Sequence, residues 1–186
     1  MASIHMNRTA TAHTVEELLE RKDYDEAFAR LLEDYSGVIG RLCMALLGNQ
    51  SDAEDALQDT FVEALKCLST YRGTGTVRSW LYAIARRQCF KRIAKSRKSP
   101  ALKLVSDPEV GDTALQRLHH RQLLSSALLS IKPSEREAVL LRYQSDLSYE
   151  EISEVLAIAP DAARKRVSRA LINLRVAINS LRRDYE

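Results

Sequence analysis

The sequence contains few residues that interrupt helices. Six of its 186 residues are Gly and four are Pro, and every Pro lies at position 100 or later. Since Gly and Pro mark turns and helix ends, their scarcity favours long helices and few hairpins. No stretch sustains the alternation of apolar and polar residues that a half-buried strand needs. The sequence therefore predicts an all-α protein.

Long hydrophobic runs are also missing. The longest apolar stretches, such as 138–141 and 155–159, are far shorter than the roughly 20 residues that span a membrane. The first thirteen residues lack the apolar core of a secretory signal. Three cysteines more than twenty residues apart fit neither a disulfide framework nor a zinc knuckle. We expect a cytoplasmic protein with reduced thiols and no membrane insertion.

The signatures of enzymes are absent as well. The chain has no GxxxxGK[ST] phosphate loop, and Gly73 and Gly75 lack both the third glycine and the preceding strand of a dinucleotide-binding turn. His119 and His120 are adjacent, so they point to different faces of a helix, and no Cys/His set has metal-ligand spacing. We expect no catalytic residues, no metal and no cofactor.

Helix starts are marked by capping boxes, in which a Ser or Thr and a Glu three residues later satisfy each other's backbone N–H groups. The pattern occurs at Thr14/Glu17, Ser51/Glu54, Ser134/Glu137 and Ser148/Glu151. Together with the apolar periodicity it predicts helices over 15–21, 24–47, 52–69, 77–96, 113–130, 134–143, 149–156 and 160–181.

The helical pattern lapses between Ser96 and Thr113, where two prolines and a glycine occur. A connection of this length inside one compact domain would be anomalous, so it indicates a flexible linker between two small helical domains. The predicted organisation is an N-terminal tail with a short helix (1–23), a first domain (24–97), a linker (98–112) and a second domain (113–186).

Residues 147–171 have the pattern of a helix-turn-helix. The apolar residues of the longer helix fall on one side, whereas Arg164, Lys165, Ser168 and Arg169 fall on the other. Such a helix suits the major groove, where Arg bonds guanine and Lys neutralises phosphate. Arg166 lies nearer the apolar seam and is expected to reach a phosphate or an acidic neighbour. The alternative is an ordinary amphipathic hairpin.

An acidic stripe follows Ser51. Asp52, Asp55, Asp59 and Glu63 lie within one arc of the predicted helix, and like charges at i,i+4 repel each other. A solvated face would usually contain interleaved lysines, so the stripe indicates a docking surface for a basic protein partner. A plain solvated surface is the alternative.

A segment rich in aromatic and basic residues comes next. Aromatic rings interleaved with cations suit unstacked bases, because the bases stack on the rings while Arg and Lys hold the backbone. The alternative is that Trp80 and Tyr82 belong to the core. The aromatic residues are Tyr71, Trp80, Tyr82 and Phe90, and the cations are Arg72, Arg78, Arg86, Arg87, Lys91 and Arg92.

Taken in this order, the segments 52–61, 71–86 and 147–170 resemble segments 2.2, 2.3–2.4 and 4.2 of the extracytoplasmic-function (ECF) sigma factors, group 4 of the sigma-70 family. These are small two-domain initiation factors of bacterial RNA polymerase. The sequence departs from the family pattern at Ala157, where Gly is frequent, at 162–163, where Thr-Val is usual, and at Arg87, where Asn is frequent.

The resemblance implies that the chain binds core polymerase, recognises promoter DNA and helps to melt the −10 element. The implied polymerase-binding residues are Asp52, Asp55, Gln58, Asp59 and Glu63. The implied −10 residues are Tyr71, Arg72, Arg78, Trp80, Arg86, Arg87 and Lys91, with the Tyr71 loop and Arg87 capturing a flipped base. The implied −35 residues are Arg164, Lys165, Arg166, Ser168 and Arg169.

Family members are usually held inactive by an anti-sigma factor, so we expect such a partner besides core polymerase and promoter DNA. Two rival hypotheses are a helix-turn-helix regulator that works without polymerase and a helical adaptor that binds only proteins. Run-off transcription with core polymerase separates all three, because only a sigma factor confers specific initiation.

Overall fold

The computed structural model describes residues 13–95 and 113–184, which contain helices and no strand. The all-α prediction is confirmed, and most helix bounds agree with the predicted ones to within a few residues. The elements are α1 (Val15–Glu20), α2 (Tyr24–Leu47), α3 (Gln50–Cys67), the 3₁₀ turn η1 (Leu68–Thr70), α4 (Val77–Lys95), α5 (Thr113–Ser130), α6 (Pro133–Val139), the π-helical turn η2 (Leu140–Gln144), α7 (Tyr149–Leu156) and α8 (Pro160–Asp184).

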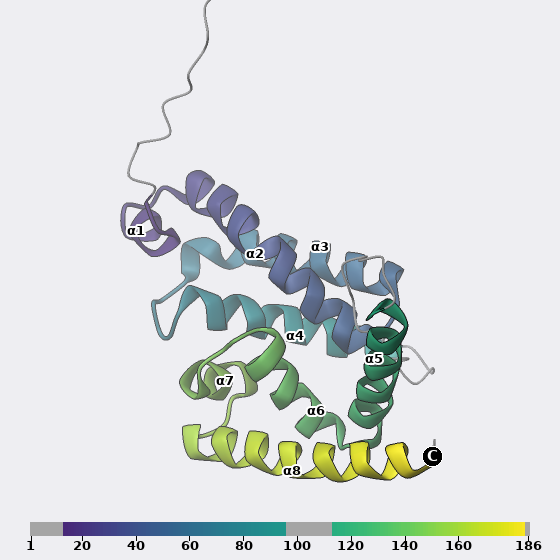
Figure 1. The fold of residues 1–186 in the computed structure, drawn as a ribbon. Helices are drawn as coiled ribbons and strands as arrows, with labels where there is room; N and C mark the ends of the chain where they lie inside the picture. Colours follow the sequence, from purple (N-terminus) through teal and green to yellow (C-terminus); the bar gives the residue numbers. More distant parts are fainter. Residues whose placement is uncertain (1–12, 96–112, 185–186) are drawn as a thin grey trace, which may run out of the picture.

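The helices form two layers (Figure 1). Helices α1 to α4 make the upper layer, and α6, α7 and α8 make the lower one, with α5 standing beside α6 and against α8. Tyr82 and Leu81 of α4 are fully buried in the core of the upper layer, as is Leu42 of α2. All three cysteines are free, and Cys43 and Cys89 are buried.

Two of the predicted capping boxes are confirmed and two are wrong. Thr14/Glu17 and Ser148/Glu151 make both reciprocal bonds. The helix around Ser51 begins earlier, because the side chain of Asn49 accepts a hydrogen bond from the backbone N–H of Asp52 at 2.8 Å. Helix α6 begins at Pro133, with Lys132 as an N-cap that makes no side-chain bond.

The lower layer has two apolar clusters. A small one joins α5, α6 and the C-terminal half of α8, and includes Leu128, Val139 and Leu174. The residues on the buried side of α7 and the start of α8, such as Ile152 and Val167, belong instead to the main core, which continues into the upper layer. The two halves of the chain, predicted as separate domains, therefore lie in direct contact, mainly through α4 and α7.

The predicted linker (98–112) and most of the predicted N-terminal tail lie outside the described residues. Within the part of the chain that the structure describes, no helix combines the length and apolar character needed to cross a bilayer.

The turn between α7 and α8 contains an unusual backbone conformation. Ala157 has φ 52° and ψ 50°, in the left-handed region. Its N–H bonds the carbonyl of Glu154 at 3.2 Å, and the N–H of Ile158 bonds the carbonyl of Ser153 at 3.0 Å. These bonds satisfy the last carbonyls of α7 in the manner of a helix C-terminal motif, which normally uses glycine.

We therefore expect the substitution Ala157→Gly to stabilise the protein by about 1 kcal/mol, since the left-handed conformation costs an L-residue roughly that much. Thermal unfolding of the two proteins measures the difference. Ala162→Gly, in a right-handed exposed turn of α8, is the control and should destabilise instead. A lower unfolding temperature for Ala157→Gly would contradict the expectation.

Candidate functional site

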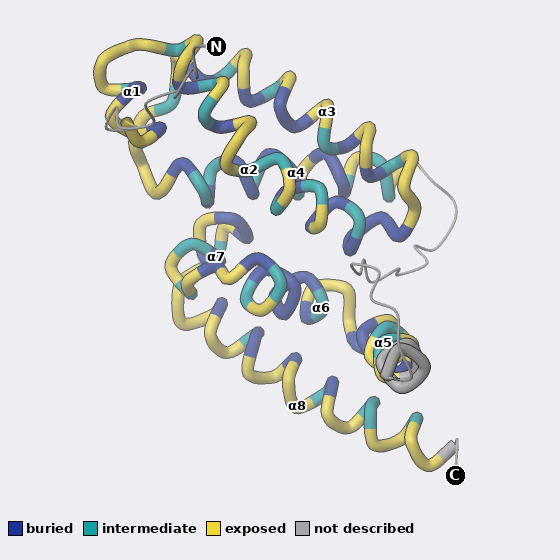
Figure 2. Tube along the Cα trace, turned by 45° about the horizontal axis from the view of Figure 1, so that its top comes forward, coloured by how far each residue is buried: buried dark blue, intermediate teal, exposed yellow. Residues whose placement is uncertain are grey.

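The basic residues of α8 form one exposed row. Arg164, Lys165, Ser168 and Arg169 are all exposed and line an open groove together with Ile172. The opposite side of the helix is held by buried residues of the core, among them Ala163, Val167, Ala170 and Leu174. The outward face of α8 is visible along its length in Figure 2. The arrangement is the one that the helical periodicity predicts.

Tyr149, the first residue of α7, supports this row. The guanidinium carbon of Arg164 lies 5.2 Å from the centre of its ring, and that of Arg142 lies 5.4 Å from the same centre. Contacts of this kind restrict the orientation of Arg164. Sequence analysis missed both Tyr149 and Arg142, since only the fold brings these two residues to the start of α8.

Arg166 is half-buried, unlike its neighbours. Its charge lowers the pKa of the Glu137 carboxyl, as does Arg86, but burial of this carboxyl is the larger influence and raises the pKa overall. The acidic neighbour that the sequence analysis expected for Arg166 is thus Glu137.

The acidic stripe of α3 is partly exposed, and its carboxylates have hydrogen-bond or ion-pair partners. Asp55 and Asp59 both bond Arg92 of α4, at 3.5 and 2.5 Å, and Glu63 bonds Arg87 at 3.2 Å. Their side chains are still accessible, with Asp55 56% exposed and Asp59 55% exposed. Repulsion between the two aspartates is therefore offset by one shared guanidinium.

Asp52 of the stripe and Gln58, which the family resemblance implies for polymerase binding, also lie on α3. Asp52 bonds the amide of Asn49 at 2.6 Å, and Gln58 is exposed. Val62 and Leu65 are about half exposed on the same side of α3. Sequence analysis missed these two apolar residues, although their spacing of four and seven from Gln58 places them on one face. The surface is acidic at one end and apolar at the other.

The loop before α4 is closed by its own tyrosine. The hydroxyl of Tyr71 donates to the carbonyl of Gly75 at 2.8 Å, and the ring centre lies 5.3 Å from that of Trp80. Partial burial raises the pKa of Tyr71. Gly73 and Gly75 have φ values of 67° and 92°, which an L-residue would adopt only with strain. Tyr71 and Trp80 thus form one aromatic pair at the start of α4.

The predicted −10 residues of α4 divide into two groups. Arg87 and Lys91 are exposed, as is Arg72 in the preceding loop. Arg78 and Arg86 are only partly exposed and face the lower layer. Arg86 bonds Glu137 through Nε at 2.5 Å and Nη2 at 3.4 Å.

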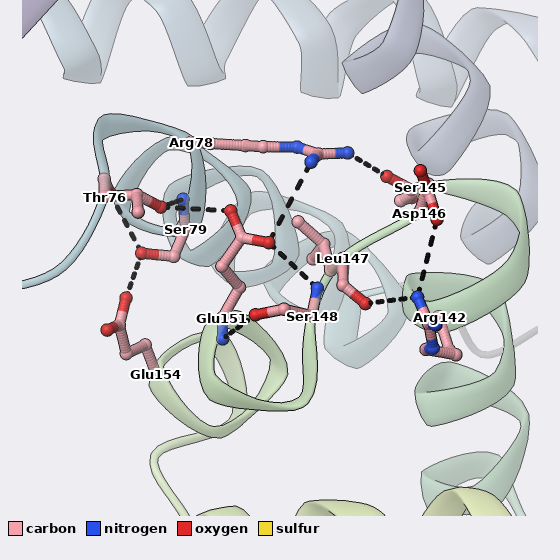
Figure 3. A network of polar contacts seen from close by, with 10 residues as sticks. All are labelled: Thr76, Arg78, Ser79, Arg142, Ser145, Asp146, Leu147, Ser148, Glu151 and Glu154. Atoms are coloured by element: carbon pink, nitrogen blue, oxygen red, sulfur yellow. Dashed lines mark hydrogen bonds and ion pairs between the residues drawn. The ribbon is translucent and has the colours of Figure 1, made fainter.

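Arg78 bonds residues near the start of α7. It donates to the carbonyl of Ser145 and lies 3.9 Å from Glu151 Oε2 (Figure 3). The structure therefore does not bring all the predicted −10 cations to one open face.

In the described part of the chain, no group of three His, Cys, Asp or Glu side chains is placed to hold a metal ion. What the surfaces offer is charge, aromatic rings and apolar contact. Their arrangement suits nucleic acid at α8 and at the Tyr71 loop, and a protein at α3.

Comparison with known protein families divides the chain into two modules. Residues 31–99 match the family described as Sigma-70 region 2, and residues 121–174 match Sigma-70, region 4. The RNA polymerase sigma factor CarQ of Myxococcus xanthus is 31% identical over 166 residues, covering 85% of this chain and 90% of CarQ. The ECF RNA polymerase sigma factor SigW of Bacillus subtilis is 26% identical, covering 87% of this chain and 94% of SigW.

Solved structures show the same fold. CnrH in complex with the cytosolic domain of CnrY matches with a TM-score of 0.68 and 20% identity, over 89% of this chain and 98% of CnrH. The sigma factor RpoE in complex with the anti-sigma factor NepR from Bartonella quintana matches with a TM-score of 0.67 and 21% identity, over 82% and 96% of the two chains.

Two sigma-70 modules in this order define a transcription initiation factor. The chain belongs to the ECF sigma factors, group 4 of the sigma-70 family. It is accordingly an RNA polymerase sigma factor, a class of initiation factors rather than of enzymes.

Tyr82 is a core residue, as the alternative in the sequence analysis held. It is fully buried, and its hydroxyl has no hydrogen-bond partner among the described residues. Burying a hydroxyl without a partner is unfavourable.

Tyr82→Phe should therefore leave the free energy of unfolding unchanged or raise it by up to about 1 kcal/mol. Urea unfolding measures this free energy. A clear loss of stability in the variant would contradict the expectation, because it would mean that the Tyr82 hydroxyl makes a stabilising hydrogen bond.

Proposed function

We propose that this sigma factor works through three separate surfaces. The acidic and apolar face of α3 binds core RNA polymerase, the Tyr71 loop and α4 bind the melted −10 strand, and α8 reads the −35 duplex. The observation that carries the proposal is the exposed basic row on α8, held from behind by the core. Run-off transcription with core polymerase tests it, since a regulator without polymerase or a protein-binding adaptor would not direct specific initiation.

Recognition of the −35 element follows from the geometry of α8. Arg164 and Arg169 can bond guanine O6 and N7 in the major groove, while Lys165 and Ser168 suit phosphate. Tyr149 limits the conformations of Arg164 before DNA arrives, which reduces the entropy lost on binding. Arg166 is half-buried and is proposed to contact the DNA backbone rather than a base.

Binding of core polymerase uses both the acidic and the apolar residues of the α3 face. Asp52, Asp55, Asp59 and Glu63 attract a basic partner, and charge complementarity mainly speeds and orients the encounter. Val62 and Leu65, together with Gln58, provide the desolvated centre that contributes affinity in protein interfaces. Arg92 holds two of the carboxylates in place from behind.

Capture of the −10 strand is assigned to the loop and the exposed side of α4. An unstacked base can stack on Tyr71 once the ring leaves Trp80, and Arg87 is an exposed cation of α4. Arg72 and Lys91 would hold phosphates. Trp80 supports the ring of Tyr71, and Arg78 and Arg86 would join the surface once their present partners leave.

The remaining assignments are organisational. The chain is proposed to act as a region 2 domain (24–97) and a region 4 domain (113–186) joined by a linker (98–112), with residues 1–23 as a tail. The factor would act in the cytoplasm, where polymerase and promoter DNA are found. An anti-sigma partner is also proposed, because NepR and the cytosolic domain of CnrY bind proteins of this fold.

The α3 assignment predicts a loss of core binding on charge reversal. Asp55→Lys with Asp59→Lys removes both partners of Arg92 and repels a basic surface, so affinity for core polymerase should fall at least about tenfold. Equilibrium binding to labelled core measures it. The control, Glu20→Lys with Glu150→Lys, makes the same charge change at exposed sites elsewhere. Equal affinity of the two variants, with circular dichroism unchanged, would remove α3 as the docking surface.

The two DNA surfaces should respond differently to a pre-melted promoter. Tyr71→Ala should lose roughly 1–3 kcal/mol of stacking, and transcription should recover on a template mismatched at −10, because flipping costs less where pairing is already lost. Arg164→Ala, whose contact is made to closed duplex, should show no recovery. Rescue of both variants, or of neither, would contradict the assignment of melting to the Tyr71 loop.

A further inference from the structure

Three glutamates of region 4 lie against the side of α4 that faces them. Glu137 of α6 bonds Arg86. Glu151 of α7 accepts from the hydroxyl of Thr76 at 3.2 Å and lies near Arg78. Glu154, one helical turn further along α7, accepts from the hydroxyl of Ser79 (Figure 3). A row of carboxylates on one module thus faces a row of donors on the other.

The contact is sealed by apolar packing. Buried residues of η2 and α7, such as Leu141, Ile152 and Leu156, belong to the same apolar cluster as Val77 and Leu81 of α4. Glu137 is only 3% exposed. An ion pair is stronger where water is excluded, but each of its charges is costly to bury alone. The pair formed by Glu137 and Arg86 therefore depends on the two modules remaining together.

The backbone of both modules is shaped for this contact. A Cβ atom at Gly75 would overlap the carboxylate of Glu154, so the glycine permits the close approach of α7. Arg78 donates to the carbonyl of Ser145, a buried residue just before α7. On the other edge, Gln144 of η2 donates to the carbonyl of Arg41 in α2 at 3.4 Å.

A carboxylate bonded to an arginine resembles a phosphate group of DNA in its negative charge and in its acceptor oxygens. Both anions accept bonds from the same guanidinium groups, so a strand of DNA and this row of glutamates compete for α4. We propose that Glu137, Glu151 and Glu154 form an intramolecular latch in the free sigma factor. The latch covers Arg78 and Arg86, the two members of the proposed −10 surface that are bonded to region 4, and region 4 must leave before a single strand can reach them.

This inference rests on the proposed role of α4, and it has a consequence for the order of events. The basic row of α8 stays exposed while the latch is closed. Duplex DNA can therefore meet α8 in the closed form, whereas single-stranded DNA cannot reach Arg78 and Arg86. The latch blocks one of the two DNA surfaces and leaves the other open.

The test uses the full chain with Glu137→Gln and Glu154→Gln combined. Each substitution keeps the size of the side chain and removes its charge, which leaves Arg86 beside a neutral amide and favours its return to water. The control, Glu20→Gln with Glu150→Gln, removes the same charge from exposed positions. Small-angle X-ray scattering reports the separation of the modules, and fluorescence anisotropy reports binding of a labelled single-stranded oligonucleotide of mixed sequence.

The latch predicts a larger radius of gyration for the variant and about a tenfold or greater gain in affinity for the single strand over the control, since apparent affinity scales with the open fraction. Binding of duplex DNA should be equal in the two proteins. Should Glu137→Gln prevent folding, judged by circular dichroism, Glu154→Gln alone should move both readouts in the same direction with a smaller amplitude.

Two outcomes would overturn the latch. One is an unchanged radius together with unchanged affinity, and the other is an opened molecule whose affinity for the single strand equals that of the control. An experiment with core polymerase added then shows whether the latch alone fails or whether the proposed −10 role of the loop and α4 fails too. If Tyr71→Ala still weakens single-strand binding by the polymerase-bound factor, the proposed role of the loop and α4 stands and only the latch fails. If it does not, the proposed function of that surface fails as well.

Discussion

Helix α4 is buried on two opposite sides, and most features of the molecule depend on this constraint. One side packs on α2 and α3 in region 2, and the other meets α7 of region 4. Apolar residues alone cannot satisfy both sides, because Arg78, Ser79 and Arg86 lie on the second one. Buried cations and hydroxyls need partners, and carboxylates of region 4 supply them. The position of region 4 thus follows from the polar groups of α4.

The burial of α4 on two sides also explains how far the sequence predicts this structure. Helix bounds, the helix-turn-helix and the outward row on α8 follow from local signals, namely caps and periodicity, which depend on neighbours a few residues away. The partners of Arg78 and Arg86 lie more than fifty residues further along the chain. The clustering of aromatic and basic residues predicted a DNA surface that includes these arginines, and nothing in the local sequence indicates that another helix packs against them.

The misplaced capping boxes have a similar cause. Ser51 satisfies the pattern, but Asn49 is an equally good N-cap two residues earlier, and the longer helix gains further hydrogen bonds. Pro133 begins α6 ahead of Ser134, since its fixed φ suits a first helical position. A capping motif shows where a helix can begin. Which of several neighbouring N-cap residues is used decides the first residue of the helix.

Glu151 has two roles at once. One of its carboxylate oxygens accepts from the backbone N–H of Ser148 at 2.9 Å and so closes the capping box of α7, and the other accepts from Thr76 of α4. A substitution at this position would alter the first helix of the DNA-reading unit together with the contact between the modules. Of the three glutamates, Glu137 and Glu154 can therefore be changed without removing a bond of this capping box. The contact between the modules and the start of α7 can be adjusted separately at those two positions, whereas a change at position 151 alters both at once.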